Sequence, residues 1–332
     1  MIEVEGLRKE YGDFVAVEGS SFAVDPGEVF GVVGPNGAGK TTTLKMLAGL
    51  VEPTAGSARV AGYDAGDDEM RRHLGFLPEE SPLYEEMTPR SYLRFFADLY
   101  GVDRATADER IERTLDRLDL EYRDRALGDV SKGMKRKVAI ARSLVNDPDV
   151  LVYDEPASGL DPLTTNYIVE FTRELADRGK TVVFSAHNLY HVEEVCDRIA
   201  IMNGGRVVAQ GAVEALRREH GTTEYHVYTD VALDGSTREN GHFRLTVDSM
   251  DAVESVRERL ATREGRVLDI RTRESTLEGV FLDLASREVG GRSVRARGGG
   301  RGNGDGRRDG AEGGPQGERR PTDLRDREAD TR

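Results

Sequence analysis

The stretch Gly34-Pro35-Asn36-Gly37-Ala38-Gly39-Lys40-Thr41 matches the phosphate-binding loop pattern G-x-x-x-x-G-K-[ST] at every fixed position. A pattern this short also occurs by chance, so it needs a strand before it and a helix after it. The apolar run Val29–Val33 before it is typical of a strand that is buried on both faces. After it, Leu44, Leu47 and Ala48 recur at helical spacing. The context therefore favours a strand–loop–helix unit over an ordinary glycine-rich turn.

The residue types of this loop suit the phosphates of a nucleotide. Its glycines let the backbone curl so that N–H groups point inward, and the start of the helix adds a positive dipole. Lys40 supplies a charge for the outer phosphates, and the Thr41 hydroxyl suits Mg²⁺.

A second acidic site is expected at Asp154 and Glu155, which follow the apolar strand Val150–Tyr153. Asp154 is placed to hold Mg²⁺ directly or through water. On an extended backbone, Glu155 points away from Asp154, and a carboxylate there can polarise an attacking water. The four apolar residues before the pair argue against two merely surface-exposed acids.

Strands alternate with helices over residues 1–220, which predicts an α/β nucleotide-binding domain with a mainly parallel sheet. Antiparallel strands are expected early and late in this domain, and residues 88–146 form an inserted helical block. Residues 221–289 predict a small α+β accessory domain. Residues 290–332 contain 12 Gly and few large apolar residues, so we expect this tail to be disordered.

The chain has 332 residues and a net charge of −14. Residues 290–332 hold 11 Arg and 8 Asp or Glu, so they carry +3 and the rest carries −17. An acidic body argues against bulk nucleic-acid binding, and it indicates either a high-salt habitat or a genome that favours Arg over Lys. Neither a leader pattern nor an apolar run of about 20 residues, the length that spans a bilayer, is evident. The sequence predicts a soluble protein, or one held at a membrane by a partner.

With these motifs in place, residues 2–218 resemble the ATP-binding cassette ATPases. Val130-Ser131-Lys132-Gly133-Met134 stands where that family has its Leu-Ser-Gly-Gly-Gln signature. Ser158–Asp161 resembles the family's dimer-contact loop, and His187 its switch histidine. Tyr11 matches the aromatic residue that stacks on adenine, and Glu79 stands where the family's loop glutamine is usual.

The resemblance implies ATP and Mg²⁺ as cofactors and assigns roles to particular residues. The catalytic residues would be Glu155, His187 and Lys40, and the metal ligands Thr41, Asp154 and Glu79. The residues that bind the nucleotide would be Tyr11, Gly34, Pro35, Asn36, Gly37, Ala38, Gly39, Lys40, Thr41, Thr42, Ser131, Gly133 and Asp161. The positive run Lys135–Lys137 either adds charge near the phosphates or forms a solvated helix face.

The family implies a head-to-tail homodimer in which each ATP lies between one subunit's phosphate loop and the other's signature. Residues 77–88 and Thr276–Leu282 are similar to the subgroup that serves drug, sodium or polysaccharide exporters. We therefore expect an ATPase subunit on the cytoplasmic face of the membrane, bound to a separate integral-membrane permease, with Leu83 and Tyr84 at the docking site. The alternatives are a translation-factor ATPase, which resembles two fused cassettes, and a DNA-repair ATPase, which a long coiled coil interrupts.

Overall fold

A six-stranded sheet carries the phosphate loop at its centre, in the order β10-β9-β3-β8-β7-β6. The computed structural model describes residues 1–186, 188–220, 223–273 and 277–281, so His187 and the tail 290–332 lie outside the described residues. The neighbouring pairs from β9 to β6 are parallel, and β10 is antiparallel to β9. The strands are β3 (Val29–Val33), β6 (Leu74–Leu77), β7 (Val150–Tyr153), β8 (Thr181–Ala186), β9 (Arg198–Asn203) and β10 (Arg206–Ala212).

Both faces of this sheet are buried, which explains its unbroken apolar runs. Successive side chains of β7 point to opposite faces, so Val150 and Val152 join one core cluster and Leu151 and Tyr153 the other. α1 (Lys40–Leu47) contributes to the first cluster. The second cluster is covered by α6 (Pro162–Asp177) and α7 (Leu189–Val195), among other helices. The phosphate loop is therefore held between two packed layers.

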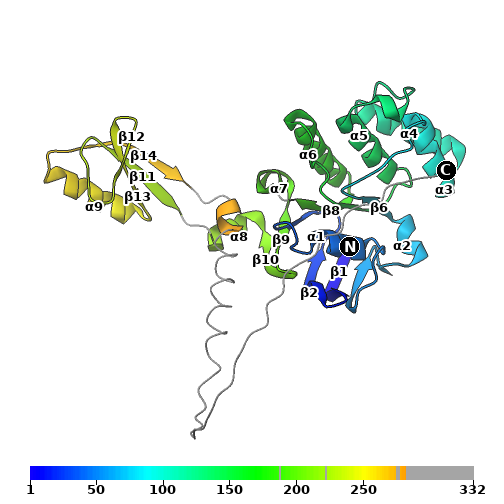
Figure 1. Cartoon of the computed structure of the whole chain (residues 1–332), viewed down its shortest axis with the longest axis horizontal. Helices are drawn as coiled ribbons and strands as arrows, with labels where there is room; N and C mark the ends of the chain where they lie inside the picture. Colours follow the sequence, from blue (N-terminus) through cyan, green and yellow to red (C-terminus); the bar gives the residue numbers. More distant parts are fainter. Residues whose placement is uncertain (187, 221–222, 274–276, 282–332) are drawn as a thin grey trace, which may run out of the picture. The chain divides into compact units, whose positions relative to one another are not determined.

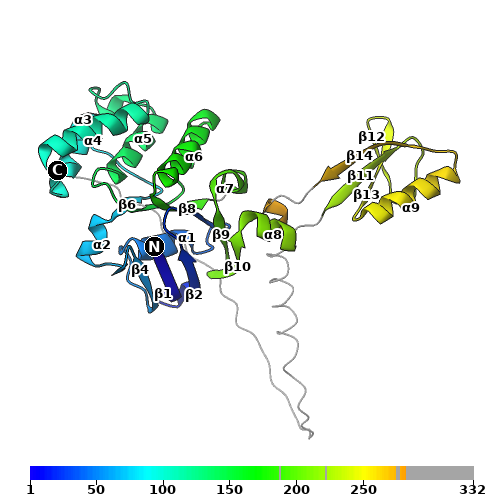
Figure 2. The ribbon, with the colours of Figure 1, turned by 180° about the vertical axis from the view of Figure 1, so that it is seen from behind.

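An antiparallel sheet shares the first cluster with α1, in the order β2-β1-β4-β5. Figures 1 and 2 show β1 and β2 on one side of the central sheet and the helices α3 to α6 on the other. The elements are β1 (Ile2–Tyr11), β2 (Phe14–Val24), β4 (Ala55–Val60) and β5 (Tyr63–Asp64), followed by α2 (Asp68–Arg72). The mixed α/β fold with a mainly parallel sheet and an antiparallel β part is as predicted.

A helical block occupies the segment between β6 and β7. It consists of α3 (Pro89–Leu99), α4 (Arg104–Arg117), the 3₁₀ turn η1 (Leu127–Asp129) and α5 (Lys132–Ser143). Thr88 and Ser91 form a capping box at the start of α3, and Ser131 caps α5 by accepting a hydrogen bond from the N–H of Met134. Both caps fix where these helices begin.

A third sheet has its own small core. Its order is β12-β13-β11-β14, with one helix, α9. The buried side chains are Val227, Leu233, Leu245, Val253, Val256 and Leu260. The elements are β11 (Glu224–Thr229), β12 (Thr237–Glu239), β13 (His242–Val247), α9 (Met250–Ala261) and β14 (Val267–Arg273).

Residues 277–281 return to the core of the first domain. Leu277 and Val280 are fully buried in the same cluster as Val213 and Leu216 of α8 (Val213–His220). The backbone N–H of Leu277 also donates a hydrogen bond to the carboxylate of Glu193 on α7. This segment thus contributes core side chains to the nucleotide-binding domain, although the sequence places it in the accessory one.

Candidate active site

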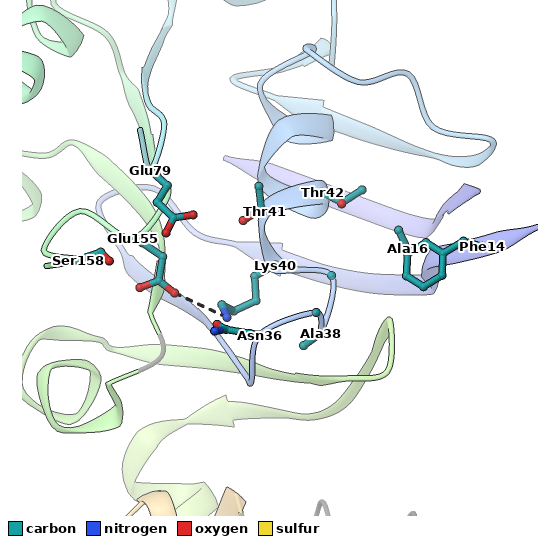
Figure 3. Close-up of a pocket in the computed structure, with 12 residues that line it drawn as sticks. Phe14, Ala16, Asn36, Ala38, Lys40, Thr41, Thr42, Glu79, Glu155 and Ser158 are labelled. Carbon is teal, nitrogen blue, oxygen red and sulfur yellow. Dashed lines mark ion pairs between the residues drawn. The ribbon is translucent and has the colours of Figure 1, made fainter. Parts of the chain in front are cut away.

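A pocket of about 450 Å³ opens beside the phosphate loop (Figure 3). Glu79 and Glu155 lie to one side of Lys40, and Phe14 lies to the other. The lining residues are Phe14, Ala16, Asn36, Gly37, Ala38, Gly39, Lys40, Thr41, Thr42, Glu79, Glu155 and Ser158. Seven consecutive loop and helix residues therefore face one space, as the pattern predicts for a phosphate site.

Two glycines of the loop are required by close backbone contacts. A Cβ at Gly34 would lie 2.3 Å from the backbone oxygen of Met202, and one at Gly39 would lie 2.6 Å from that of Ala16. Both residues also have positive φ angles, +155° and +100°. Gly37, with φ +79°, has no atom within 4 Å of the corresponding position and faces open space. The loop forms a cradle that a phosphate can approach.

The ammonium group of Lys40 is buried inside this loop. Its Nζ donates hydrogen bonds to the backbone oxygens of Gly34 at 2.8 Å and Pro35 at 3.2 Å. It also lies 3.6 Å from Oε1 of Glu155. The lysine charge is therefore held inside the loop by its backbone oxygens, close to the Glu155 carboxylate.

Thr41, Asp154 and Ser185 form a chain of oxygen atoms under the loop. Oδ1 of Asp154 accepts hydrogen bonds from the hydroxyls of Thr41 at 3.2 Å and Ser185 at 2.6 Å. Asp154 is buried, and a hydroxyl beside a carboxylate is a hard oxygen donor set that suits Mg²⁺. These residues fit the predicted metal.

Ser185 is a site residue that the sequence did not reveal. It is fully buried near the end of β8, and its hydroxyl also accepts the backbone N–H of Glu155 at 2.9 Å. It thus orients both acids at once. One feature of the sequence could have indicated Ser185. It is the hydroxyl residue near the carboxyl end of the otherwise apolar run Val182–Ala186, which pairs with the strand before Asp154.

Glu155 does not lie on an extended backbone, so that part of the expectation is wrong. β7 ends at Tyr153, and Glu155 takes the left-handed conformation with φ +47°. This conformation is uncommon outside glycine, and it persists where surrounding contacts enforce it. The turn separates the two carboxylates, and the Glu155 side chain lines the pocket while Asp154 lies beneath it.

The aromatic residue in the pocket lining is Phe14, while Tyr11 is not among the lining residues. The two residues pair across the β1–β2 hairpin, and both rings are exposed, at 63% for Phe14 and 49% for Tyr11. The ammonium of Lys9 lies 5.2 Å from the centre of the Tyr11 ring. Adenine stacking on Tyr11 stays a prediction, and Phe14 becomes a second candidate.

The predicted signature residues do not line the pocket of their own chain. Ser131 is exposed at the first turn of α5, and Gly133 is half-buried. A Cβ at Gly133 would lie 3.2 Å from the Thr164 side chain, so glycine permits close packing of α5 on the start of α6. Binding of nucleotide by Ser131 and Gly133 therefore stays a prediction.

Three further predicted residues are Asp161, Glu79 and His187. Asp161 caps α6, where its carboxylate accepts hydrogen bonds from the N–H and hydroxyl of Thr164 at 3.0 and 2.7 Å. These bonds hold the pKa of Asp161 below its usual value. Glu79 lines the pocket, which leaves its metal role a prediction. His187 lies outside the described residues.

Known proteins are similar to this chain in sequence and in fold. The family model described as ABC transporter matches residues 17–158. The Nod factor export ATP-binding protein I of Burkholderia orbicola (strain AU 1054) is 41% identical over 218 residues, which cover 65% of this chain and 72% of that protein.

Two solved structures share the fold. One is the dimeric, post-hydrolysis ATP-binding cassette MJ0796 bound to ADP and Pi, with a TM-score of 0.58 and 25% identity over 64% of this chain and 98% of that one. The other is cbiO1 from Clostridium perfringens, described as part of the ABC transporter complex cbiONQ. Its TM-score is 0.60 and its identity 28%, and the match covers 66% of this chain and 90% of cbiO1.

The translation-factor and DNA-repair alternatives find no support among these similarities, whereas the transporter prediction does. The chain belongs to the ABC transporter family, as an ATP-binding subunit with ATPase activity.

Proposed function

We propose that two copies of this chain close head to tail around two ATP molecules and thereby power an exporter. The observation that carries the proposal is the placement of Ser131 and Gly133, at the start of α5 and away from the pocket of their own chain. A helix N-terminus offers N–H groups and a positive dipole to phosphate. The post-hydrolysis cassette of similar fold is itself described as a dimer.

The pocket residues divide the chemistry of hydrolysis among them. Glu155 takes the proton from the attacking water as the new bond to phosphorus forms and the bond to the β-phosphate oxygen breaks. Lys40 offsets the charge of the outer phosphates. The contact to the γ-phosphate is assigned to His187 from the family resemblance alone, since this residue lies outside the described ones. Thr41 and Asp154 would hold Mg²⁺, with Glu79 as a further candidate ligand, and the ion supplies charge neutralisation at the phosphates. Positioning and electrostatics carry most of the rate enhancement.

Export is the direction that the similarities support, since the relative from Burkholderia orbicola is named for Nod factor export. None of the helices in the described ranges combines the length and apolar character that crossing a bilayer requires. We propose that a separate integral-membrane permease binds this chain at the cytoplasmic face of the membrane, as the description of cbiO1 as part of a complex supports.

An exposed aromatic ridge beside the Glu79 loop is the proposed dock for the permease. The Tyr84 ring is 57% exposed and packs edge-on against Phe95, with ring centres 5.8 Å apart. Leu83, by contrast, is half-buried and packs against the core, so it is a poorer candidate than the sequence indicated. The ridge is therefore Tyr84 and Phe95, which suit the apolar face of a short helix.

The double variant Tyr84→Asp, Phe95→Asp tests this dock. It should lose co-purification with the membrane protein while basal ATPase activity stays within about twofold, because neither ring lines the nucleotide pocket. The matched control is Tyr122→Asp, another exposed aromatic residue of the helical block. If the double variant stays membrane-bound, the dock lies elsewhere. If no membrane protein co-purifies with wild type, the permease proposal fails.

A further inference from the structure

A single arginine ties the signature helix to the ends of two strands that carry pocket residues. Arg136 lies in the second turn of α5, and its guanidinium reaches the loops that follow β6 and β7. All five of its N–H groups have a backbone carbonyl acceptor. Nε donates to Pro156 at 2.7 Å, Nη1 to Pro78 at 2.7 Å and Glu79 at 2.9 Å, and Nη2 to Asp154 at 3.0 Å and Glu155 at 2.9 Å.

This arrangement needs the fixed fork of an arginine. The guanidinium presents five donors in one plane, whereas a lysine presents three on one nitrogen and a glutamine presents two. The acceptors come from two loops, because β6 and β7 are adjacent parallel strands whose carboxyl ends meet at one edge. Neither a lysine nor a glutamine has enough donors to bond all five carbonyls.

The charge of Arg136 is buried without a carboxylate hydrogen-bond partner among these five contacts. Arg136 is only 8% exposed, and burial lowers the pKa of its guanidinium to about 10, so the side chain stays protonated at neutral pH. A buried cation is costly unless its donors are satisfied. Removing it takes a donor away from five carbonyls, three of them in the left-handed turn at Glu155. The Ser81 hydroxyl still donates to the carbonyl of Pro78, and the N–H of Ser158 to that of Glu155.

The neighbouring cations show that this role is particular to Arg136. Lys135 pairs with Glu85 at 2.7 Å, and the ammonium of Lys137 lies 3.8 Å from the centre of the Tyr167 ring. Both side chains are partly exposed. The two predictions for the run, phosphate charge or solvated face, therefore both fail for Arg136, which is buried and faces away from solvent.

We propose that Arg136 is a positioning residue for ATP hydrolysis, which holds the Glu155 turn and the Glu79 loop in fixed register with α5. This inference rests on the proposed role of Glu155 as the base. In the head-to-tail dimer, the start of α5 contacts one ATP and Glu155 acts on the other. Arg136 is then the link inside each subunit that makes the two nucleotide sites move together.

The test compares Arg136→Ala and Arg136→Lys with Arg142→Ala in the full-length chain. Arg142 is the matched control, since it lies on the same helix and contacts residues of α3. Its Nη1 donates to the Tyr92 hydroxyl at 3.2 Å, and its guanidinium lies 5.4 Å from the centre of the Phe96 ring. We expect kcat of both Arg136 variants to fall on the order of 100-fold, as when a catalytic group is misplaced. KM for ATP should stay within about threefold, because the phosphate loop is untouched.

Chemical rescue adds a second readout. The Arg136→Ala variant leaves a space shaped for guanidinium, so millimolar guanidinium should restore much of its kcat, while methylammonium at the same concentration should not. Arg142→Ala should keep kcat within about twofold of wild type and respond to neither ion. If Arg136→Ala does not fold, Arg136→Lys carries the kinetic comparison.

Two results would overturn the inference. One is wild-type kcat in Arg136→Lys, and the other is a kcat loss in Arg136→Ala that matches Arg142→Ala at equal loss of melting temperature. The Glu155→Gln variant shows whether such a result contradicts the positioning role of Arg136 or the proposed role of Glu155 as the base. If Glu155→Gln turns over ATP normally, the base is wrong. If Glu155→Gln is inactive while Arg136→Ala keeps wild-type kcat, only the positioning role of Arg136 is wrong.

Discussion

Lys40 Nζ lies 3.6 Å from Glu155 Oε1, and both side chains are largely buried, at 6% and 10% exposure. The predicted phosphate ligand and the predicted base therefore offset one another's charge in the pocket. We expect the phosphates of ATP to compete with Glu155 for the lysine, because opposite charges attract. Removing the Glu155 carboxylate should therefore change ATP binding as well as turnover.

Glu155→Gln should nearly abolish turnover and leave ATP binding intact or tighter. A carboxamide keeps the shape but is a poor proton acceptor, and general-base catalysis contributes roughly 100-fold or more. Removing the negative charge near Lys40 favours the phosphates. Turnover is measured by phosphate release, and ATP-stabilised dimers by size exclusion. The control is Glu170→Gln, an exposed acid of α6. Wild-type turnover in Glu155→Gln would exclude it as the base.

Ser185→Ala should raise the Mg²⁺ concentration that half-saturates nucleotide binding by about tenfold, the usual effect of losing a partner that orients a metal ligand. The variant removes the 2.6 Å hydrogen bond to Asp154 and the 2.9 Å bond from the Glu155 backbone. Fluorescence of a bound nucleotide analogue during Mg²⁺ titration measures the shift.

Ser143→Ala is the control for this change, because its buried hydroxyl pairs with the Tyr153 hydroxyl at 3.0 Å rather than with the site. Both variants should lose roughly 1 kcal/mol of stability from the missing hydrogen bond. An equal Mg²⁺ requirement in the two variants would show that Ser185 contributes to folding only.

Tyr11→Ala should raise KM for ATP about tenfold if its ring stacks on adenine, since stacking of a base on an aromatic ring is worth about 1–3 kcal/mol. Tyr11→Phe keeps the ring and should behave like wild type. Phe14→Ala provides the comparison, because Phe14 lines the pocket and Tyr11 does not. A KM that rises in Phe14→Ala and not in Tyr11→Ala would move the stacking role to Phe14.

The folded body should gain stability from salt, because residues 1–289 carry −17. Like charges on a compact surface repel one another, and ions screen this repulsion. The melting temperature, followed by circular dichroism, should rise from low to molar KCl. A neutral osmolyte at equal osmolality controls for exclusion from the surface. A melting temperature that does not change with KCl would contradict the interpretation of the acidity as an adaptation to high salt.

The strands and the phosphate loop were predictable because burial on both faces leaves a simple pattern. Val29–Val33 and Val150–Tyr153 are unbroken apolar runs, and the glycines of residues 34–39 follow at fixed spacing. Helices α7 and α8 were not predicted. Each is short, at seven and eight residues, and each follows directly on a strand or its turn, so neither shows two clear helical periods.

The contacts that complete the site could not be predicted from the sequence, for a different reason. Arg136 sits between two lysines, and composition alone cannot say which of three cations is buried. Its five carbonyl acceptors become neighbours only when β6 and β7 pair. Ser185 likewise meets Asp154 only across two adjacent strands. A backbone carbonyl is present whatever the residue type, so a side chain that bonds to backbone selects no particular residue at the partner position.

The return of Leu277 and Val280 to the core with α8 makes residues 223–273 a topological insertion rather than an appendage. Closing a flexible loop of this length costs on the order of a few kcal/mol of chain entropy. In the folded third sheet Glu224 pairs with Arg273, so the two ends of the segment already lie side by side. Unfolding of this sheet would restore the entropy cost of holding residues 277–281 in the core of the domain. Cutting the chain after residue 220 therefore does not isolate the natural nucleotide-binding domain, because it removes two side chains of that domain's own core.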